Sequence, residues 1–360
     1  MSSLFVGCDA HKHYSQLEVQ DSSAQVLRRA RIDHSRGALS SFFTKLPPGT
    51  PVALESVGNW YWIADEIEAA GCLPLLTNPA KAKLLMGHVN KTDKLDASGL
   101  TTLLRLGSLP SVWLPPAALR DQRELPRTRM TLCTWRTRIK NRIHSLLAKY
   151  NLSPQDGSTI FSQRGRGWLD SAVPSLPPET ARCLAQHLQL LDYLSLQISE
   201  LEERIHSQIA LTPTMQLLKT EPGIGDMLAI VIDREVGSIS RFPSPQQFSS
   251  YSGTTPRVSS SGGKTHYGKM RTESNQYLKW AFIEAANAVA AHHAQRGWTE
   301  RHCSKLYLRV RSRKGASVAI GAVARHLAES TYWVLTKNEP YQEPTKVSPR
   351  QGEHGHNMCP

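Results

Sequence analysis

LFVGCDAHKHYSQLEVQDSSAQVLRRARI, residues 4–32, is the stretch that decides the fold of the first part of this 360-residue chain. It contains three runs rich in β-forming residues, LFVGCD, SQLEVQ and QVLRRARI, which are separated by short polar segments. We therefore expect three consecutive strands. The first run ends on Asp9, a charged residue that closes an apolar strand and needs an explanation.

Alternating strand and helix patterns continue after these runs. They predict a helix at 35–46, a strand at 51–55, a helix at 59–71, a strand at 72–77 and a helix at 79–87. The order β-β-β-α-β-α-β-α is typical of an α/β domain built on one mixed sheet. We place this domain at residues 1–150, including a basic helical stretch at its end.

The rest of the chain is predicted to be mostly helical. Residues 151–212 are expected to form a loop-rich linker and a short coiled coil, because five apolar residues follow a 3-4-3-4 spacing: Leu191, Leu194, Ile198, Leu201 and Ile205. A helix that packs on its own domain would show the same stripe. Residues 213–337 are expected to form a second globular unit, and residues 338–360 a disordered tail.

The charge balance indicates a polyanionic partner. Lys and Arg together number 43 and Asp and Glu 30, which gives a formal net charge of +13. Cationic side chains concentrate between residues 116 and 150, where nucleic-acid contacts are expected from Arg136, Arg138, Lys140 and Arg142. A solvated helix face is the alternative interpretation.

Cysteines and apolar segments point to a cytosolic protein without a membrane segment. The six cysteines are scattered and form no C-x-x-C pair, so neither a disulfide framework nor a structural zinc site is expected. The sequence lacks a signal-peptide pattern, and its apolar stretches are interrupted by charges before they reach bilayer-spanning length.

Four carboxylates in the first domain predict a metal site. Asp9 and Glu55 each end a strand, and Asp93 and Asp96 lie three apart at the start of a predicted helix. Ligands gather at the carboxyl ends of strands in α/β sheets, and converging carboxylates repel one another unless cations intervene. Mg²⁺ or Mn²⁺ is the expected ion. The structural alternative is a turn-forming Asp9, with Asp93 as a helix N-cap.

The second globular unit carries a serine-rich stretch, GTTPRVSSSGGKTHYGKM. Hydroxyls in a flexible glycine-flanked loop beside Arg257 and Lys264 suit a nucleophile that attacks a phosphate, although a plain linker has the same composition. A nucleotide-binding P-loop is disfavoured, because Val258 stands where that motif needs a glycine. The PGIG turn at 222–225 resembles the hairpin of helix-hairpin-helix DNA-binding modules.

Both halves of the chain resemble one known family. The blocks CDAHK, ALESVGNW, TNPAKAK, KTDKLDA, PGIG, GTTPRVSSSGGK and KGASVAIGAVARHLA are similar to those of the DEDD-type transposases of the insertion sequence 110 family, which includes Piv/MooV invertases and bridge-RNA-guided recombinases. The order strand Asp, strand Glu, helix Asp-x-x-Asp also resembles the RNase H-like (RuvC-like) nuclease fold. The resemblance extends to residue 337.

The resemblance implies a site-specific DNA recombinase. Its metal-binding acids would be Asp9, Glu55, Asp93 and Asp96, and its nucleophile Ser261, with Ser259 and Ser260 as neighbouring alternatives. A structured noncoding guide RNA and a homo-oligomer, a dimer of dimers, are implied as well. Two rivals remain: a metal-dependent nuclease or junction resolvase that uses water, and a non-catalytic nucleic-acid-binding derivative.

Overall fold

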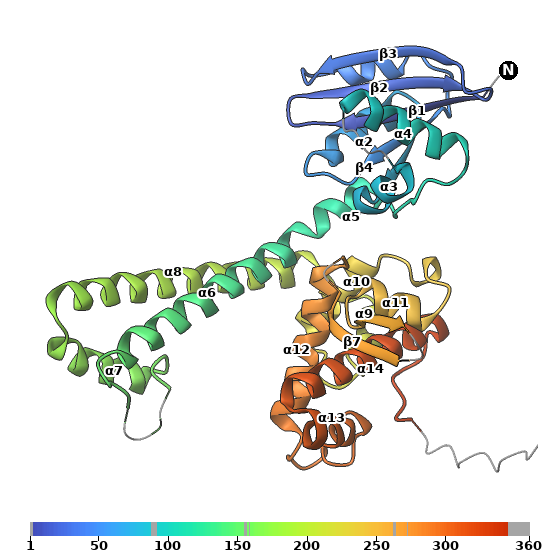
Figure 1. Ribbon diagram of the computed structural model, residues 1–360. Coiled ribbons are helices and arrows are strands. Elements are labelled where there is room, and N and C mark those ends of the chain that lie inside the picture. Colours follow the sequence, from blue (N-terminus) through green and yellow to red (C-terminus); the bar gives the residue numbers. More distant parts are fainter. Residues whose placement is uncertain are drawn as a thin grey trace, which may run out of the picture. The chain divides into compact units, whose positions relative to one another are not determined.

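The computed structural model describes residues 3–87, 92–154, 157, 159–261, 264–271 and 273–344, with the backbone alone at 264, 265 and 267. The chain divides into two compact units, Met1–Asp121 and Gln122–Pro360 (Figure 1). The boundary therefore precedes the basic helix, which we had expected to belong to the first domain. No helix in the described ranges is long and apolar enough to cross a lipid bilayer.

The N-terminal unit is built on the mixed sheet that the sequence predicts. Its strands are β1 (Leu4–Ala10), β2 (Tyr14–Asp21), β3 (Val26–Asp33), β4 (Pro51–Glu55) and β5 (Leu73–Thr77), in the order β3-β2-β1-β4-β5. The first three strands pair antiparallel, whereas β1, β4 and β5 are parallel. The predicted α/β class and element order are confirmed.

Helices cover both faces of this sheet. Alternate residues of β1 point to opposite faces, so Val6 and Cys8 join the core that contains α1 (Ala38–Phe43) and α2 (Trp60–Ala69). Ala53 of β4 joins the opposite core with Leu100 of α4 (Asp93–Arg105) and with α3 (Pro79–Met86). A short helix, α5 (Ala117–Gln122), closes the unit, and its buried Arg120 pairs with Asp65 of α2.

Gly7 allows α4 to lie directly against β1. A Cβ atom at this position would stand 2.2 Å from the Ala97 carbonyl oxygen and 2.4 Å from the Thr101 hydroxyl. Any side chain larger than hydrogen would therefore push the helix away. This close approach fixes the start of α4 near the carboxyl end of β1.

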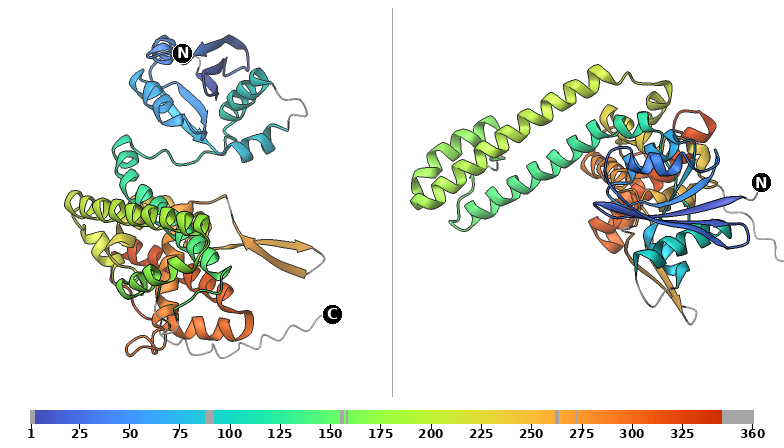
Figure 2. Two further views of the ribbon diagram at one scale, coloured as in Figure 1. Left: turned by 90° about the vertical axis from the view of Figure 1, so that its left-hand side faces the viewer. Right: turned by 90° about the horizontal axis from the view of Figure 1, so that it is seen from above.

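The C-terminal unit begins with a two-helix arm. Helices α6 (Glu124–Ala148) and α8 (Pro178–Gln208) run antiparallel, and α7 (Gln163–Ala172) packs at the far end (Figure 1; Figure 2). The loop-rich linker that we expected at the start of 151–212 is wrong for α7, because this segment is helical and its Leu169 is buried with Ile143 of α6. Pro126 does not interrupt α6, because it lies in the first turn, where proline is tolerated.

The predicted coiled-coil seam is filled within a single chain. Leu191, Leu194, Ile198 and Ile205 of α8 are already buried, and Leu191 packs with the Ile143 cluster of α6. Within the chain the stripe therefore serves helix packing, as the alternative interpretation expects. Dimerisation through this segment stays a prediction.

A helical bundle completes the C-terminal unit. It comprises α9 (Pro213–Leu218), α10 (Asp226–Val236), α11 (Pro245–Tyr251), α12 (Gln276–His292), α13 (His302–Lys314) and α14 (Ala316–Lys337), around one apolar core. Two strands, β6 (Pro256–Ser261) and β7 (Lys264–Met270), form an antiparallel hairpin between α11 and α12. Two short 3-10 turns, Val173–Ser175 and Ile239–Arg241, complete the secondary structure of the described residues.

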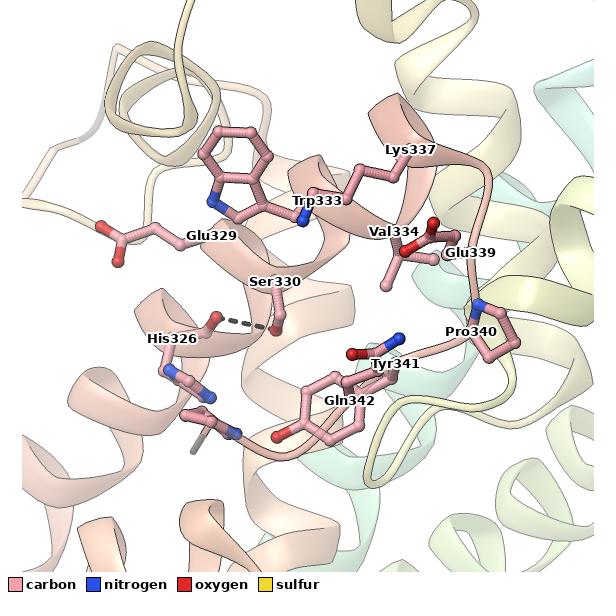
Figure 3. A pocket seen from close by; sticks show the side chains of 11 residues that line it. His326, Glu329, Ser330, Trp333, Val334, Lys337, Glu339, Pro340, Tyr341 and Gln342 are labelled. Atoms are coloured by element: carbon pink, nitrogen blue, oxygen red, sulfur yellow. Dashed lines mark hydrogen bonds between the residues drawn. The ribbon is translucent and has the colours of Figure 1, made fainter. Parts of the chain in front are cut away.

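The start of the predicted tail is folded. The Tyr341 amide donates to the Thr220 hydroxyl (2.7 Å), and the His302 amide donates to the Glu343 carboxylate (2.8 Å). Residues 339–344 thereby fold back beside α14 and enclose a cavity of about 420 Å³ with Trp333 and His326 (Figure 3). The prediction of disorder is wrong for 338–344, and residues 345–360 lie outside the described ranges.

Candidate active site

Asp9 and Glu55 lie at the carboxyl ends of neighbouring parallel strands. The register pairs Cys8 of β1 with Leu54 of β4, so the next residues, Asp9 and Glu55, stand at the same level. Asp9 follows Gly7 by two residues and Glu55 follows Ala53 by two, so both point to the face of the sheet that packs on α4. Neighbouring strands lie about 4.8 Å apart. The sheet therefore directs both carboxylates toward the same side.

Asp93 and Asp96 begin α4 on its sheet-facing side. They precede Ala97 and Leu100, which are buried, at the spacing that keeps residues on one helix face. The N-cap is Thr92, whose hydroxyl accepts from the Leu95 amide (3.3 Å).

Neither acid of α4 is therefore the cap, and the structural alternative for Asp93 is wrong. Leu95, between the two acids, is exposed although it is apolar.

His11 joins two of the four acids. Its Nε2 atom lies 3.1 Å from Asp9 Oδ2 and 3.4 Å from Asp93 Oδ2. One ligand atom from each of these three residues lies within 4.8 Å of the others, close enough to share a metal ion. His11 was not among the predicted site residues, although His11 follows Asp9 by two positions in CDAHK.

The acids interact electrostatically. Burial raises the pKa of Asp9 above its usual value, His11 opposes the increase, and the charges of Asp96 and Asp93 add to it. Neither Asp9 nor Asp96 has a lysine or arginine within 4.0 Å in the described parts of the chain. Asp9 and Asp96 therefore carry negative charge that no lysine or arginine of the described residues neutralises by an ion pair.

Tyr14 fixes the orientation of Asp93. Its hydroxyl donates to Asp93 Oδ2 (2.6 Å), and this hydrogen bond raises the pKa of the tyrosine. The Tyr14 ring stacks on His11, with centroids 4.6 Å apart, and the Arg31 guanidinium lies 3.7 Å from the tyrosine centroid. Tyr14 therefore contacts two side chains of the candidate metal site: Asp93 through a hydrogen bond and His11 through ring stacking.

A groove of about 820 Å³ opens beside the acids. It is lined by Gln16, Arg29, Ala30, Arg31, Thr92, Asp93 and Lys94. The register aligns Asp9 of β1, Gln16 of β2 and Arg31 of β3 in one row across the sheet. Arg29 pairs with the buried Glu18 (2.7 Å), whereas Arg31 and Asp33 form a long, exposed pair (3.7 Å).

The predicted nucleophile lies on a hairpin strand rather than in a flexible loop. Ser261 is exposed at the end of β6, where its backbone pairs with Lys264, while Ser259 pairs with His266 and Ser260 with Thr265. Alternation places Ser259 and Ser261 on one face and Ser260 on the other. The expectation of a loop is wrong for these serines. Gly262 and Gly263, which connect the strands, lie outside the described residues, as does the Lys264 side chain.

The hairpin projects from the bundle and is anchored at its base (Figure 2). Asn275 caps α12 by accepting from the Leu278 amide (3.0 Å), and its own amide group donates to Glu235 Oε2 (2.8 Å). Arg127 binds the Glu235 carboxylate through Nε (2.7 Å) and Nη2 (3.0 Å), with Arg123 at 3.8 Å. The base of the hairpin is therefore connected to α10 and α6.

Some of the cations predicted to contact nucleic acid are exposed, whereas others lie against protein groups. On α6, Arg136 and Lys140 are half-buried and Arg138 and Arg142 exposed; Arg257 of β6 is exposed and lies 3.9 Å from Glu273. Lys140 lies 5.0 Å from the Phe161 ring centroid. Arg127 and Arg129 of the same helix contribute to ion pairs with Glu235 and Glu202.

The PGIG turn has a packing role. A Cβ atom on Gly223, whose φ is +82°, would stand 2.3 Å from the Ala285 carbonyl oxygen of α12. The glycine is therefore required for helix packing, and a contact with phosphate at this turn stays a prediction.

Two models of transposase families match this chain. Residues 6–152 match the model of the DEDD transposase domain of IS110, and residues 215–302 match that of the transposase IS116/IS110/IS902 family. The two matches follow one another and together cover more than half of the chain. The chain belongs to the IS110 family of transposases. As an enzyme of this family, it cuts and rejoins DNA.

Several relatives are similar along most of their length. The transposase for insertion sequence element IS1328 of Yersinia enterocolitica is 27% identical over 78% of this chain and 82% of its own. The transposase for insertion sequence element IS1111A of Coxiella burnetii is 26% identical over 94% of this chain and 91% of its own. A putative transposase of Sinorhizobium fredii, y4pF/y4sB, is 26% identical over 94% and 85%, respectively.

Proposed function

We propose that Asp9, Glu55, Asp93 and Asp96 hold Mg²⁺ or Mn²⁺ against the DNA phosphodiester to be cut, in a domain of the RNase H-like (RuvC-like) fold. The observation that carries this proposal is the convergence of Asp9, Asp93 and His11 beside the charge of Asp96, without a lysine or arginine ion pair to Asp9 in the described residues. Carboxylate oxygens are the ligands that both ions prefer. The donor set therefore fits a hard divalent ion.

The chain's own groups prepare this site. Bound divalent metal supplies Lewis-acid stabilisation of the charge that develops on the phosphate. Tyr14 holds Asp93 Oδ2 through a 2.6 Å hydrogen bond and so fixes the orientation of this carboxylate. His11 lies between Asp9 and Asp93, with Nε2 3.1 Å and 3.4 Å from their Oδ2 atoms, and opposes the rise in the pKa of Asp9.

Ser261 is the proposed nucleophile. Its hydroxyl oxygen would attack phosphorus as the bond to the 3′ oxygen breaks, giving a phosphoserine linkage and a DNA 3′-hydroxyl that takes up a proton. The reverse attack by a 3′-hydroxyl would rejoin DNA without an energy cofactor. A projecting hairpin suits this role, since six strand residues extend about 20 Å from the base.

The groove beside Asp93 is the proposed path of the DNA strand. Its long Arg31–Asp33 pair is exposed, so a phosphate can replace Asp33 at little cost. Lys94 lines the same groove next to Asp93. Phosphates that flank the scissile one would thus meet cations on both walls.

Family membership favours two further parts of the proposal. A structured noncoding guide RNA would supply sequence choice by base pairing, and Arg136, Arg138, Lys140, Arg142, Arg257 and Lys264 would contact nucleic-acid backbones. A homo-oligomer, a dimer of dimers, would bring a serine hairpin to an acid cluster, from the same chain or from another copy. Purified protein that carries no discrete RNA would contradict the guided version.

Covalent trapping tests the nucleophile. Supercoiled plasmid with the element's ends would be incubated with Mg²⁺, co-purified RNA and wild-type, Ser259→Ala, Ser260→Ala or Ser261→Ala protein. We expect a covalent protein–DNA adduct on a denaturing gel for all but Ser261→Ala, because the two neighbours share the strand but not the reacting oxygen.

Each rival predicts a different result. A nuclease that uses water would still cut with Ser261→Ala and would give no adduct with any protein. A non-catalytic derivative would leave the plasmid intact with wild type, and Asp9→Ala would change nothing.

A further inference from the structure

Four cations crowd the last two turns of α13. Arg309, Arg311, Arg313 and Lys314 lie within six residues, and all four are exposed. We refer to them as the α13 cation cluster. None of them belongs to the hairpin, the arm or the acid site described above.

The α13 cation cluster has no carboxylate partner among the residues that the structure describes. In the described parts of the chain, no Asp or Glu lies within 4.0 Å of any of the four side chains. Residues 301–328 contain no acidic residue at all. Other arginines of this unit behave differently: Arg127, Arg129 and Arg166 all form ion pairs with carboxylates. The cluster is thus a region of uncompensated positive charge.

Two members of the cluster form a stripe of cations together with Lys305. Lys305, Arg309 and Arg313 follow one another at four-residue spacing, opposite Cys303 and Tyr307, which are buried. Lys305 pairs with Glu300 (2.7 Å) at the exposed surface, whereas the two arginines belong to the cluster. Eight residues of helix span about 12 Å, over which duplex DNA presents roughly seven phosphate charges. The stripe therefore matches several successive phosphates in length and charge.

Stabilisation of the helix does not account for four cations. Positive charge favours a helix C-terminus, but the effect falls off within the last turn. Arg313 Nε donates to the Arg309 carbonyl (3.2 Å), which uses one of the five guanidinium N–H groups. The remaining donors of both arginines are available to a ligand with many acceptor oxygens.

We propose that the α13 cation cluster binds the phosphodiester backbone of double-stranded DNA, without regard to sequence. Arginine matches phosphate geometry and reads no base through such contacts. DNA is the chosen occupant because the family's enzymes act on it. The inference is independent of the metal and serine chemistry, since it concerns binding alone.

Salt-dependent binding tests the proposal. The affinity of full-length protein for a fluorescent 30-bp duplex of arbitrary sequence would be measured by anisotropy at 50–200 mM KCl, in EDTA, so that cleavage plays no part. For Arg309→Gln/Arg313→Gln we expect weaker binding and a slope of log K against log salt that is shallower by about 2, one for each phosphate that the variant no longer neutralises.

Two variants make the result decisive. Arg309→Lys/Arg313→Lys keeps both charges and should retain nearly the wild-type slope. Arg182→Gln/Arg204→Gln removes two exposed cations of α8 and should leave the slope close to that of wild type. Equal losses in the α8 and α13 variants would overturn the proposal, because general net charge would then explain the effect. Loss of binding to a 30-bp RNA duplex with unchanged DNA binding would overturn the assignment to DNA.

Discussion

The acid cluster at Asp9 and the network at Glu235 bury carboxylates in opposite ways. Asp9 is 7% exposed and meets two further acids and one histidine. Glu235 is 2% exposed and meets Arg127 bidentately, Arg123 and the Asn275 amide. One group is surrounded by charge of its own sign, whereas the other is neutralised by its neighbours.

This difference separates a reactive site from a structural one. A buried carboxylate that is paired and hydrogen-bonded holds elements together, here α6, α10 and the start of α12. Carboxylates that face one another destabilise the fold until a cation binds. The protein tolerates that cost at the carboxyl end of β1, where the proposed chemistry needs it.

Asp9→Asn should break the reactive region and spare the fold. The side chain keeps its volume but loses a metal-binding charge, so we expect DNA cleavage to fall by about a thousandfold or more. Removal of like-charge repulsion should raise the free energy of unfolding in EDTA by about 0.5–2 kcal/mol. Plasmid cleavage with Mg²⁺ and urea unfolding without it measure the two effects.

A matched change outside the cluster serves as the control. Asp65→Asn removes the partner of Arg120 in the same unit and should cost stability while cleavage per folded molecule is preserved. If Asp9→Asn lowered stability and Asp65→Asn abolished cleavage, the assignment of Asp9 to the reactive site and of Asp65 to a structural ion pair would be wrong.

Glu235→Gln should have the opposite outcome. It removes the carboxylate charge with which the largely buried Arg127 and Arg123 pair, so we expect a loss of about 3–5 kcal/mol in the free energy of unfolding. Glu202→Gln disrupts the more exposed pair with Arg129 and should cost less than about 1 kcal/mol. Urea unfolding measures both losses. Comparable losses in the two variants would show that the Glu235 network stabilises the fold no more than an exposed ion pair does.

The fold around the first of these regions could be predicted from the sequence. β-forming runs that end on acids predicted the strands and the order of elements, and strand polarity places Asp9 and Glu55 at one edge of the sheet. The role of Asp9, Glu55, Asp93 and Asp96 as a metal site stays a prediction. The sequence was not sufficient to identify His11 as a neighbour of two acids or Gly7 as the contact point of α4. Both depend on how α4 packs on β1.

The second region could be predicted less well. Arg127 belongs to a basic run that appeared to be a nucleic-acid surface, and only the position of Glu235, 108 residues away, gives it a structural role. The serine stretch was assigned to a loop because its composition is flexible, whereas pairing with residues 264–270 makes it a strand. Pairing over long sequence distance overrides local composition in both cases.

Glu221 sharpens the comparison as a third way of burying a carboxylate. It is 2% exposed and forms no ion pair with a basic residue in the described ranges, but accepts hydrogen bonds from Thr331 (2.7 Å) and Ser330 (3.0 Å). Burial raises its pKa to about 8. The folded protein therefore holds a proton that the unfolded chain, with a pKa near 4.5, releases.

Stability should consequently fall as pH rises between these two values. Below pH 4.5 the group contributes no pH dependence, and from there to pH 8 it should lower the free energy of unfolding by up to about 1.4 kcal/mol per pH unit. Glu221→Gln should remove this contribution and flatten the profile, while Glu203→Gln, at an exposed position of α8, should leave it unchanged. Urea unfolding at pH 5, 6, 7 and 8 measures it. A variant profile as steep as that of wild type would mean that Glu221 is ionised in the folded protein, and then it would need a cation as Asp9 does.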